Sequence, residues 1–378
     1  MSSRTSPLAR LGDASLLKSD ALIEGAWVRG RSRFDVIDPA TGDKLADVAT
    51  VDAADVQAAL TAANKAWPTW RGMTARERSA CLMRWHQLLH QHAEDLARII
   101  TAENGKPLLE AKGEVAYGAS FIEWFAEQAN RVDGETIPTT DNDKRYLVIK
   151  QPVGVCAAIT PWNFPIAMLT RKVAPALAAG CTVVVKPAEQ TPLSALALAE
   201  LAQRAGVPPG VLNVVTADAS NSIEVGKLLC SSDIVRHLSF TGSTEVGRIL
   251  AAQCAPTIKK LALELGGNAP FIVFDDADID SAVEGAMAAK YRNSGQTCVC
   301  ANRLYVQDGV YDAFVDKFAA KVKTLKVGNG FDAGVTQGPL IDEAAVAKVE
   351  RHVADALSKG AGLLLGGKKI GERYFEPT

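Results

Sequence analysis

The sequence predicts an α/β fold built on a doubly wound parallel sheet. From Pro152 to Cys254, strand-like apolar segments alternate with helical segments, and glycines or prolines separate them. One segment, Thr182 to Lys186, is a continuous β-branched run that ends in a lysine, which is typical of a parallel strand buried on both faces. Strands that alternate with helices pair in parallel through right-handed crossovers. Such a sheet binds ligands at the carboxyl ends of its strands.

The composition indicates a globular protein with more than one domain. At 378 residues the chain is too long for one ordinary core, so we expect two or three domains. The net charge of −2 gives no reason to expect nucleic acid or an anionic membrane as a partner. No apolar run reaches the roughly 18 residues that span a bilayer, and Met1 to Arg10 lacks the apolar core of a signal peptide. We therefore expect a cytoplasmic protein.

The cysteines indicate neither a disulfide framework nor a metal site. There are seven, an odd number, and they are scattered through a long chain. No two have C-x-x-C spacing, and the five histidines show no ligand spacing, so we expect no metal. The cysteines are Cys81, Cys156, Cys181, Cys230, Cys254, Cys298 and Cys300.

The N-terminal part of the sequence predicts a hairpin followed by helices. Residues 1–20 resemble a loose leader. Apolar and polar residues then alternate in two segments around the turn residues Asp38 to Gly42, which indicates a hairpin. A helix carries four aromatic residues at helical spacing, a stripe that favours the core over a cofactor site. The predicted hairpin strands lie in 21–30 and 34–49, the helices in 52–67, 74–104 and 108–132, and the stripe is Tyr117, Phe121, Trp124 and Phe125.

The strands and helices after residue 134 are predicted from the same patterns of apolar residues. A polar extended segment, Glu135 to Gln151, contains the apolar run Tyr146 to Ile149, and a strand this exposed favours a contact between subunits. After it come the alternating elements of the sheet and then a second α/β unit. Strands are predicted at 153–160, 182–186, 211–216, 237–240, 260–264, 271–274 and 303–306, and helices at 166–179, 191–205, 223–229, 243–254, 277–291, 311–325 and 343–358.

Cys298 lies in a small, polar, glycine-bearing stretch, Arg292 to Cys300, that follows a predicted helix. A free cysteine is most often a small buried hydrophobic residue, and that interpretation suits most of the others. In this loop, however, a thiol is placed to meet a ligand. Because a free thiol is only a few per cent ionised at neutral pH, it needs a nearby base or other charge to form the thiolate.

Two further side chains follow strand ends. Glu264 ends the apolar strand Leu261 to Leu263, and a carboxylate desolvated there would suit a general base; the alternative is a surface glutamate at a strand end. Asn163 lies between two prolines at the end of the strand 153–160. Its amide could donate a hydrogen bond to an oxyanion, which is worth about 2.7–4 kcal/mol in a transition state. The alternative is a turn residue.

A nucleotide site is indicated at two other strand ends. Lys186 and Glu189 follow the buried strand, where an open α/β sheet holds a nucleotide ribose. A carboxylate there would accept from the ribose hydroxyls and repel a 2′-phosphate. Phe240 to Gly247 predicts a strand, a turn and a helix start, whose N–H groups suit a pyrophosphate. Since this is not the G-x-G-x-x-G pattern, the motif alone leaves nucleotide binding open.

Together and in this order, these motifs closely resemble those of the aldehyde dehydrogenase superfamily. The resemblance covers the chain from about Asp38, and within the family it is strongest to the succinate-semialdehyde dehydrogenase branch. Three runs support the branch: Thr170–Val173, Gly266–Phe271 and Cys298–Arg303. The matching family motifs are Pro161–Pro165, Lys186–Glu189, Phe240–Gly247, Leu263–Gly267 and Gly295–Cys298.

The resemblance implies a mechanism. Cys298 would attack the aldehyde, with Asn163 and the Cys298 N–H holding the oxyanion; a hydride would pass to the cofactor; and Glu264 would activate the water that hydrolyses the thioester. NAD is favoured over NADP, because many NADP-preferring bacterial relatives have a small residue where Glu189 stands. The residues implied for the cofactor are Trp162, Lys186, Glu189, Gly242, Ser243 and Gly247.

The semialdehyde branch implies further roles. Arg171 and Arg292 resemble the guanidinium groups that bind the carboxylate of the substrate, since a planar fork matches a carboxylate bidentately; ordinary surface arginines are the alternative. Cys300 resembles the partner of Cys298 in a reversible disulfide, although such a short loop would be strained and a bystander role is equally open.

The resemblance also implies a domain plan. Residues 1–134 and 152–262 would form a Rossmann-like cofactor domain, 135–151 an oligomerisation strand, and 263–378 an incomplete catalytic domain. Family members are roughly a fifth longer, so we expect a missing tail, and a homodimer or homotetramer for the full-length form. Three alternatives stay open: a dehydrogenase for glutarate semialdehyde, a coenzyme-A-acylating relative, which Glu264 disfavours, and an inactive nucleotide-binding fragment.

Overall fold

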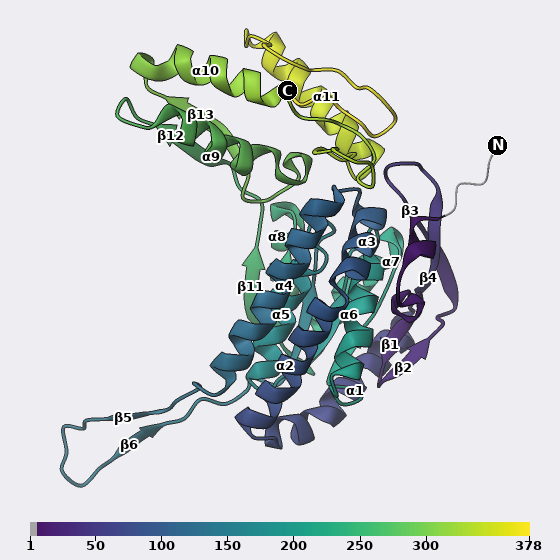
Figure 1. Ribbon diagram of the computed structural model, residues 1–378. Helices are drawn as coiled ribbons and strands as arrows, with labels where there is room; N and C mark the ends of the chain where they lie inside the picture. Colours follow the sequence, from purple (N-terminus) through teal and green to yellow (C-terminus); the bar gives the residue numbers. More distant parts are fainter. Residues whose placement is uncertain (1–5) are drawn as a thin grey trace.

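The structure, a computed structural model, describes residues 6–378. Its centre is a seven-stranded sheet with the strand order β11-β10-β7-β8-β9-β1-β2. Figure 1 labels β11 at one side of the molecule and β1 and β2 at the other. The first five of these strands run parallel, and β1 and β2 add an antiparallel edge. The strands are β1 (Ala21–Ile23), β2 (Ala26–Val28), β7 (Val155–Ile159), β8 (Thr182–Lys186), β9 (Leu212–Val214), β10 (Val235–Thr241) and β11 (Lys260–Glu264).

The crossovers make this sheet doubly wound, as the sequence predicts. From β7 the chain moves through β8 to β9, and it then returns to add β10 and β11 on the other side of β7. The point where the direction reverses therefore lies beside β7, which is where sheets of this kind bind ligands. The crossover helices are α5 (Ala167–Ala178), α6 (Pro192–Arg204), α7 (Ala219–Ser231) and α8 (Thr244–Cys254).

The β-branched strand β8 lies between two hydrophobic cores. Val183 and Val185 point into the larger core, and Val184 points into the smaller core on the opposite face. This alternation follows from the two-residue period of a strand. Each fully buried valine contributes about 1.5–3 kcal/mol of hydrophobic stabilisation. The predicted burial of β8 on both faces is confirmed.

The N-terminal region contains two hairpins and four helices. Besides the β1–β2 pair, β3 (Ser32–Ile37) pairs with β4 (Lys44–Thr50) across the predicted turn. The predicted helix 74–104 is two helices, because the chain breaks at His92. Its predicted capping box is present, with Thr74 and Glu77 bonded reciprocally. The helices are α1 (Ala53–Gly72), α2 (Ala75–Gln91), α3 (Ala93–Asn104) and α4 (Leu108–Ala129).

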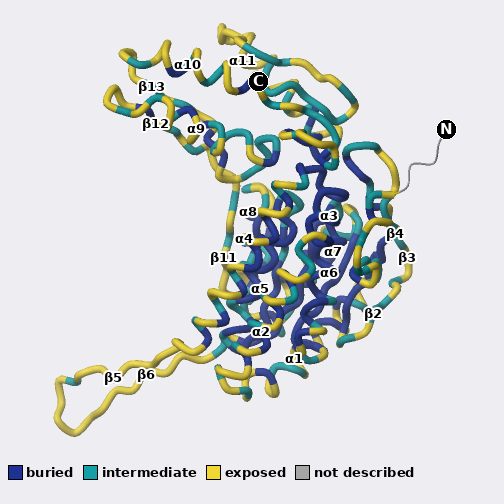
Figure 2. Tube along the Cα trace, in the orientation of Figure 1, coloured by how far each residue is buried: buried dark blue, intermediate teal, exposed yellow. Residues whose placement is uncertain are grey.

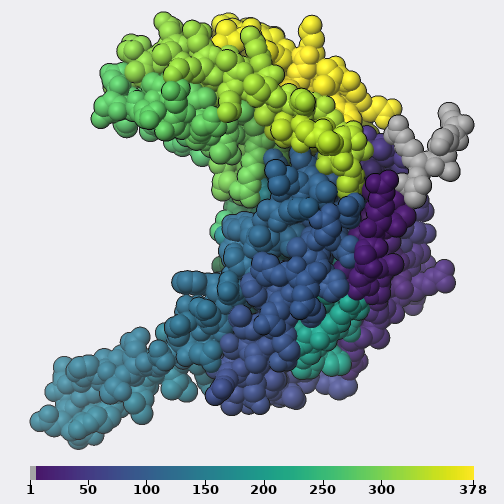
Figure 3. Space-filling model, in the orientation of Figure 1, coloured from purple at the N-terminus to yellow at the C-terminus, as the bar shows by residue number. Residues whose placement is uncertain are grey.

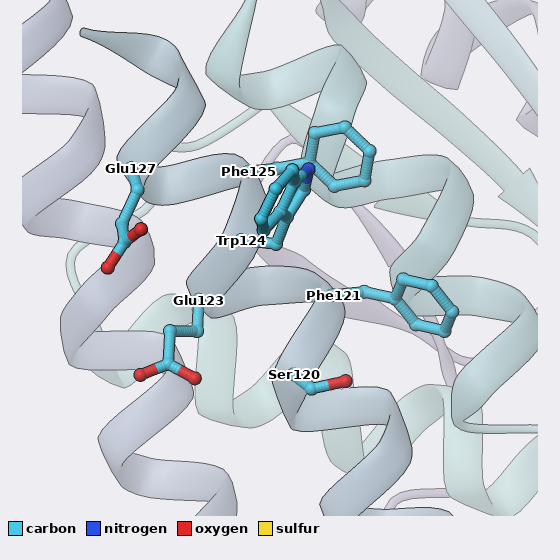
Figure 4. A pocket seen from close by; sticks show the side chains of 6 residues that line it. All are labelled: Ser120, Phe121, Glu123, Trp124, Phe125 and Glu127. Atoms are coloured by element: carbon cyan, nitrogen blue, oxygen red, sulfur yellow. The ribbon is translucent and has the colours of Figure 1, made fainter.

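The core prediction for the aromatic stripe on α4 is only half right: Phe125 packs against the main core and Phe121 against a small cluster, whereas Tyr117 and Trp124 face outward. Tyr117 is 39% exposed and Trp124 is 59% exposed, while Phe121 and Phe125 are half-buried. The helix packs on α2 and α5 through small residues, among them Gly118 and Ala119. A surface hollow lies beside the stripe (Figure 4). It is lined by Ser120, Phe121, Glu123, Trp124, Phe125 and Glu127.

The predicted oligomerisation strand is one half of a hairpin. β6 (Tyr146–Val148) pairs with β5 (Glu135–Ile137), and together they project from the body of the molecule (Figure 1). Every residue of both strands is exposed (Figure 2). The strand therefore has an intramolecular partner on one side, which its sequence did not reveal, and an open edge on the other.

A second unit lies against one end of the first (Figure 3). Two parallel strands pair in it, and Phe314 and Val273 contribute to its small separate core. Hydrogen bonds tie the units together, including Leu108 N to Gly330 O at 3.0 Å. No helix in residues 6–378 is both long enough and apolar enough to cross a membrane. The elements of this unit are β12 (Ala269–Val273), α9 (Ile279–Tyr291), β13 (Ala301–Val306), α10 (Asp308–Val322) and α11 (Glu343–Ser358).

Candidate active site

Four strand ends place the predicted residues along one edge of the sheet. Lys186 ends β8 and is paired in register with Ile159 of β7, and Ile159 is also paired with Phe240 of β10. Next along the edge, Thr241 is paired with Glu264 at the end of β11. The turn that contains Asn163 continues from β7. The candidate catalytic residues and the candidate cofactor-binding residues thus share the carboxyl edge of the sheet, which is the position that the doubly wound topology predicts.

Cys298 is the exposed member of the seven cysteines, and the other six are buried. It lies just beyond α9, after a turn in which Asn293, Ser294 and Gly295 have φ values of 50°, 55° and 77°. A non-glycine residue in this left-handed region costs about 1–3 kcal/mol and persists only where neighbouring groups hold it. Ser294 is held by a hydrogen bond from its hydroxyl to the carbonyl oxygen of Gly338 at 2.9 Å. The predicted presentation of the thiol to solvent is observed.

The Asn163 side chain reaches the Cys298 loop. Its Nδ2 donates a hydrogen bond to the carbonyl oxygen of Gln296 at 2.9 Å, two residues before the thiol. The segment after β11 also comes close, since a Cβ added at Gly267 would lie 3.8 Å from the carbonyl oxygen of Cys298. The structure therefore brings the β7 turn, the segment after β11 and the cysteine loop together.

Glu264 stands at the predicted strand end, and its exposed position matches the surface-glutamate alternative rather than the desolvated carboxylate. β11 is the edge strand of the sheet, and both Glu264 and most of the strand are exposed. In the apolar run before it, Leu261 is exposed and Leu263 is half-buried. Its backbone carbonyl accepts from Gly242 N at 3.1 Å. In residues 6–378 no hydrogen bond joins its side chain to Cys298.

Lys172 is a neighbour of the site that the sequence analysis missed. It lies on α5, is buried, and donates from Nζ to Ser239 Oγ of β10 at 2.9 Å. Burial, assisted by the positive charge of Arg171 and opposed by the negative charge of Glu264, lowers the pKa of Lys172 to about 8. A lysine on the buried face of a helix directly after the Asn163 turn is the signal that could have identified it.

The predicted ribose-binding pair is preformed. The Lys186 ammonium lies 3.4 Å from Glu189 Oε2, and the lysine side chain is almost fully buried while the glutamate is partly exposed. Burial lowers the pKa of Lys186, and the carboxylate of Glu189 opposes that shift. A hydrogen-bond donor and an acceptor thus lie together at the end of β8, as the hydroxyls of a ribose require.

The start of α8 fits a pyrophosphate. The helix begins after Ser243, whose hydroxyl accepts from Val246 N at 3.2 Å, so its first N–H groups face the same edge. A Cβ at Gly247 would lie 2.5 Å from the Leu265 side chain, and one at Gly242 would collide with the Phe240 ring. A larger residue at either position would therefore force the facing Leu265 or Phe240 side chain to move. Trp162 is half-buried nearby, and its carbonyl accepts from Asn104 Nδ2 at 3.1 Å.

The two predicted carboxylate-binding arginines lie on one aromatic surface. Arg171 lies 5.2 Å from the centre of the Phe121 ring, and Arg292 lies 4.6 Å from Phe164 and 5.9 Å from Tyr117. The Tyr117 and Phe121 rings contact each other at 4.8 Å, which connects the two positions. Within residues 6–378 neither guanidinium forms an ion pair with a carboxylate, although Arg171 Nη1 donates to Met168 Sδ at 3.8 Å.

Cys300, unlike Cys298, is not exposed. It is buried, its sulfur accepts from Thr297 Oγ1 at 2.8 Å, and it lies 3.3 Å from the carbonyl oxygen of Gly295. Both thiols are free.

A doubly wound sheet whose carboxyl edge meets an exposed cysteine and a side-chain amide is typical of a dehydrogenase that acts through a thiol. The chain belongs to the aldehyde dehydrogenase family, because the model of that family matches residues 27–378.

Several relatives are closely similar over nearly the whole chain. The glutarate-semialdehyde dehydrogenase of Pseudomonas aeruginosa is 62% identical over 373 residues, which are 98% of this chain and 77% of the relative. The NADP(+) succinate-semialdehyde dehydrogenase of Escherichia coli is 61% identical over the same shares of the two chains. The crystal structure of succinate-semialdehyde dehydrogenase from Burkholderia pseudomallei has a TM-score of 0.95 and 61% identity, and the match covers 97% of this chain and 77% of that chain.

Proposed function

We propose that this protein oxidises a short aldehyde that carries a carboxylate at its other end, with NAD(P) as the hydride acceptor. Succinate semialdehyde is the leading substrate, and glutarate semialdehyde is the alternative. The observation that carries the proposal is the pair of guanidinium groups of Arg171 and Arg292, which form no ion pair within residues 6–378, together with the loop that presents an exposed thiol. The names of the relatives support it, since both named aldehydes carry a distal carboxylate.

The proposed chemistry uses three side chains. The Cys298 thiolate attacks the aldehyde carbon, a C–S bond forms, and the carbonyl electrons move to the oxygen. That oxyanion accepts hydrogen bonds from the Asn163 amide and the Cys298 N–H, so the amide must turn from the Gln296 carbonyl that it contacts here. When bound, the nicotinamide accepts the hydride. Glu264 then removes a proton from water, which attacks the remaining thioester and releases the carboxylate and the thiol.

The cofactor site is proposed on the carboxyl edge. Lys186 and Glu189 would hold the ribose, and the start of α8 with Gly242, Ser243 and Gly247 would hold the phosphates beside Trp162. These groups fit, because they combine buried donors, an acceptor and a close backbone approach. NAD is the favoured form, since the Glu189 carboxylate would repel a 2′-phosphate, although one relative is named for NADP.

Replacing this carboxylate tests the cofactor assignment. Glu189→Ser is expected to raise the ratio of kcat/KM with NADP to kcat/KM with NAD by about 10- to 100-fold, because a like-charge contact costs several kcal/mol. Initial rates with each cofactor measure the ratio. Glu224→Ser, an exposed glutamate on α7, is the control and should leave it unchanged. An unchanged ratio in Glu189→Ser would reject this residue as the selector.

The substrate assignment is tested by removing one guanidinium. Arg171→Leu is expected to lower kcat/KM for succinate semialdehyde about 10- to 100-fold, since a hydrogen bond to a charged group is worth about 1.5–3 kcal/mol. Butanal, which has the same carbon chain without the carboxylate, should lose less than about threefold. NADH absorbance measures both rates, and Arg351→Leu on the exposed face of α11 is the control. Equal losses for the two aldehydes would contradict the carboxylate site.

The same assay separates the other candidates. Wild-type protein that reduces no cofactor with any aldehyde would support the inactive nucleotide-binding alternative. A higher kcat/KM for glutarate semialdehyde than for succinate semialdehyde would move the assignment to the longer substrate. Both outcomes are read from initial rates at equal aldehyde concentrations.

The proposal also assigns a role to each of three parts of the chain. Residues 1–134 and 152–262 would bind the cofactor, 263–378 would carry the nucleophile, and 135–151 would join subunits through the open edge of the β5–β6 hairpin. Exposed apolar residues on that edge, including Leu147 at 77% and Ile149 at 72%, support a homo-oligomer. Seven free thiols support a cytoplasmic location, since disulfides are rare there.

A further inference from the structure

A buried ion pair lies behind the turn that carries Asn163. Lys106 Nζ is 2.5 Å from Glu114 Oε2, and each side chain is 1% exposed. The same ammonium donates to the backbone carbonyl of Asn163 at 2.8 Å and lies 4.0 Å from the centre of the Phe164 ring. The pair therefore contacts the residue proposed to hold the oxyanion, although it is shielded from solvent itself.

The ion pair belongs to a segment that holds this turn at several points. Asn104 Nδ2 donates to the carbonyl oxygen of Trp162 at 3.1 Å, just before Asn163. Glu114 Oε1, the oxygen opposite the lysine, accepts from Ile166 N at 2.9 Å and Ala167 N at 3.3 Å, where α5 begins. The segment 104–114 thus fixes the turn before, at and after the residue that carries the amide.

The same segment also holds the cysteine loop. Glu110 Oε2 accepts from Asn293 N at 2.8 Å, and the Asn293 side chain donates to the Asn163 carbonyl at 3.1 Å. That one carbonyl oxygen thus receives hydrogen bonds from Lys106 and from the loop that leads to Cys298. The segment therefore fixes the turn that carries the Asn163 amide and the loop that carries the Cys298 thiol relative to each other.

Stability alone does not explain the ion pair. A buried pair loses the hydration of both charges, and well-packed apolar residues of similar volume are often as stable or more stable. Glu103 shows that a carboxylate in the same region can bind a helix start without a lysine. Its two oxygens accept from Leu193 N and Ser194 N at 2.8 Å each, and burial raises its pKa to about 8. What Lys106 adds at Glu114 is the bond to Asn163.

We propose that Lys106, held by Glu114, is a positioning residue that aims the Asn163 amide at the oxyanion formed on Cys298. The ammonium fixes the carbonyl of Asn163, which fixes its peptide plane and the direction of its Cα–Cβ bond. A donor misplaced by about 1 Å can slow a reaction by about 10²-fold. The inference rests on the proposed function, because it takes Asn163 as the oxyanion donor and Cys298 as the nucleophile.

Acylation by 4-nitrophenyl acetate tests the positioning without a cofactor. The Cys298 thiolate attacks the ester carbonyl, the C–S bond forms, the C–O bond breaks, and 4-nitrophenolate leaves with the bonding electrons. The tetrahedral oxyanion on this path needs the same amide. The initial rate of nitrophenolate release is measured in the wild type, Lys106→Met, Asn163→Ala and the double variant, which form a double-mutant cycle.

The cycle separates positioning from general structural damage. Lys106→Met is expected to lower the acylation rate about 10- to 100-fold in the wild type, but less than about threefold once Asn163 is alanine. Equal losses in both backgrounds, or no loss in the wild type, would overturn the proposal. If thermal melting shows that Lys106→Met does not fold, Lys106→Met/Glu114→Gln removes both charges and enters the same cycle.

Two controls keep the outcomes distinct. Glu103→Gln changes a matched buried carboxylate that binds a helix start but contacts none of the site residues, and its acylation rate should stay within about threefold of wild type. If Cys298→Ala releases nitrophenolate as fast as the wild type, the proposed nucleophile is wrong. If Cys298 is acylated but the Lys106→Met loss does not depend on Asn163, the positioning role alone is wrong.

Discussion

Cys298→Ala is expected to abolish NADH formation from succinate semialdehyde, with a loss on the order of 10⁴-fold or more, as removal of a catalytic nucleophile causes. An alanine offers no lone pair to attack the aldehyde, so neither the thiohemiacetal nor the thioester can form. The structure supports this choice of thiol, because Cys298 is exposed in the loop that Asn163 contacts, while the other six thiols are buried. NADH absorbance measures the rate.

Two cysteine controls make this result specific. Cys230→Ala removes a fully buried thiol on α7, and Cys300→Ala removes the buried thiol two residues from the proposed nucleophile. Both variants should keep activity within about tenfold of wild type, because both thiols are buried and a modest loss of folding stability leaves the protein folded. Turnover that survives in Cys298→Ala but disappears in Cys300→Ala would transfer the nucleophile to Cys300.

Local patterns predicted the parts of the fold that depend on local properties. Thr182 to Lys186 was identifiable as a buried strand because β-branched side chains without alternation suit a strand covered on both faces. The capping box at Thr74 and Glu77 was identifiable because its hydrogen bonds join residues three positions apart. The break at His92 was missed, since no glycine or proline marks it.

Burial was harder to predict than element type. The run Leu261 to Leu263 suggests a buried strand, but the strand forms the exposed edge of the sheet, and only the strand order reveals this. The stripe of Tyr117 and Trp124 has helical spacing and yet faces outward, because α4 packs through its small residues. Periodicity shows which residues share a face, whereas topology decides what covers that face.

Some residues of the candidate site could be predicted from local sequence, and others could not. Lys186, Glu189 and Asn163 could be predicted because each follows a strand end, and a parallel sheet brings such ends to one edge. Lys106 and Glu114 could not, because their contacts with the Asn163 turn join segments that are far apart in the sequence. A buried lysine with a carbonyl partner 57 positions away, as Lys106 has in Asn163, leaves no local signature.

Glu264→Gln is expected to separate hydride transfer from hydrolysis. The amide cannot accept a proton from water, so the thioester should form once and then persist. We therefore expect a burst of about one NADH per site, followed by a steady rate about 10²- to 10⁴-fold below wild type, the range for loss of a general base. Stopped-flow absorbance measures the burst, and mass spectrometry of the quenched protein should find the acyl group on the Cys298 peptide.

Because Glu264 is exposed, a second exposed glutamate is the appropriate control for its role as a base. Glu350→Gln changes an exposed glutamate on α11 and should show wild-type turnover without a burst and stall. Hydroxylamine attacks a thioester without needing a base, so its addition should restore turnover in Glu264→Gln by releasing Cys298. A steady rate equal to wild type, or a stalled enzyme with no acyl group on Cys298, would reject Glu264 as the base, and buried Lys172 beside it would then be the next residue to test.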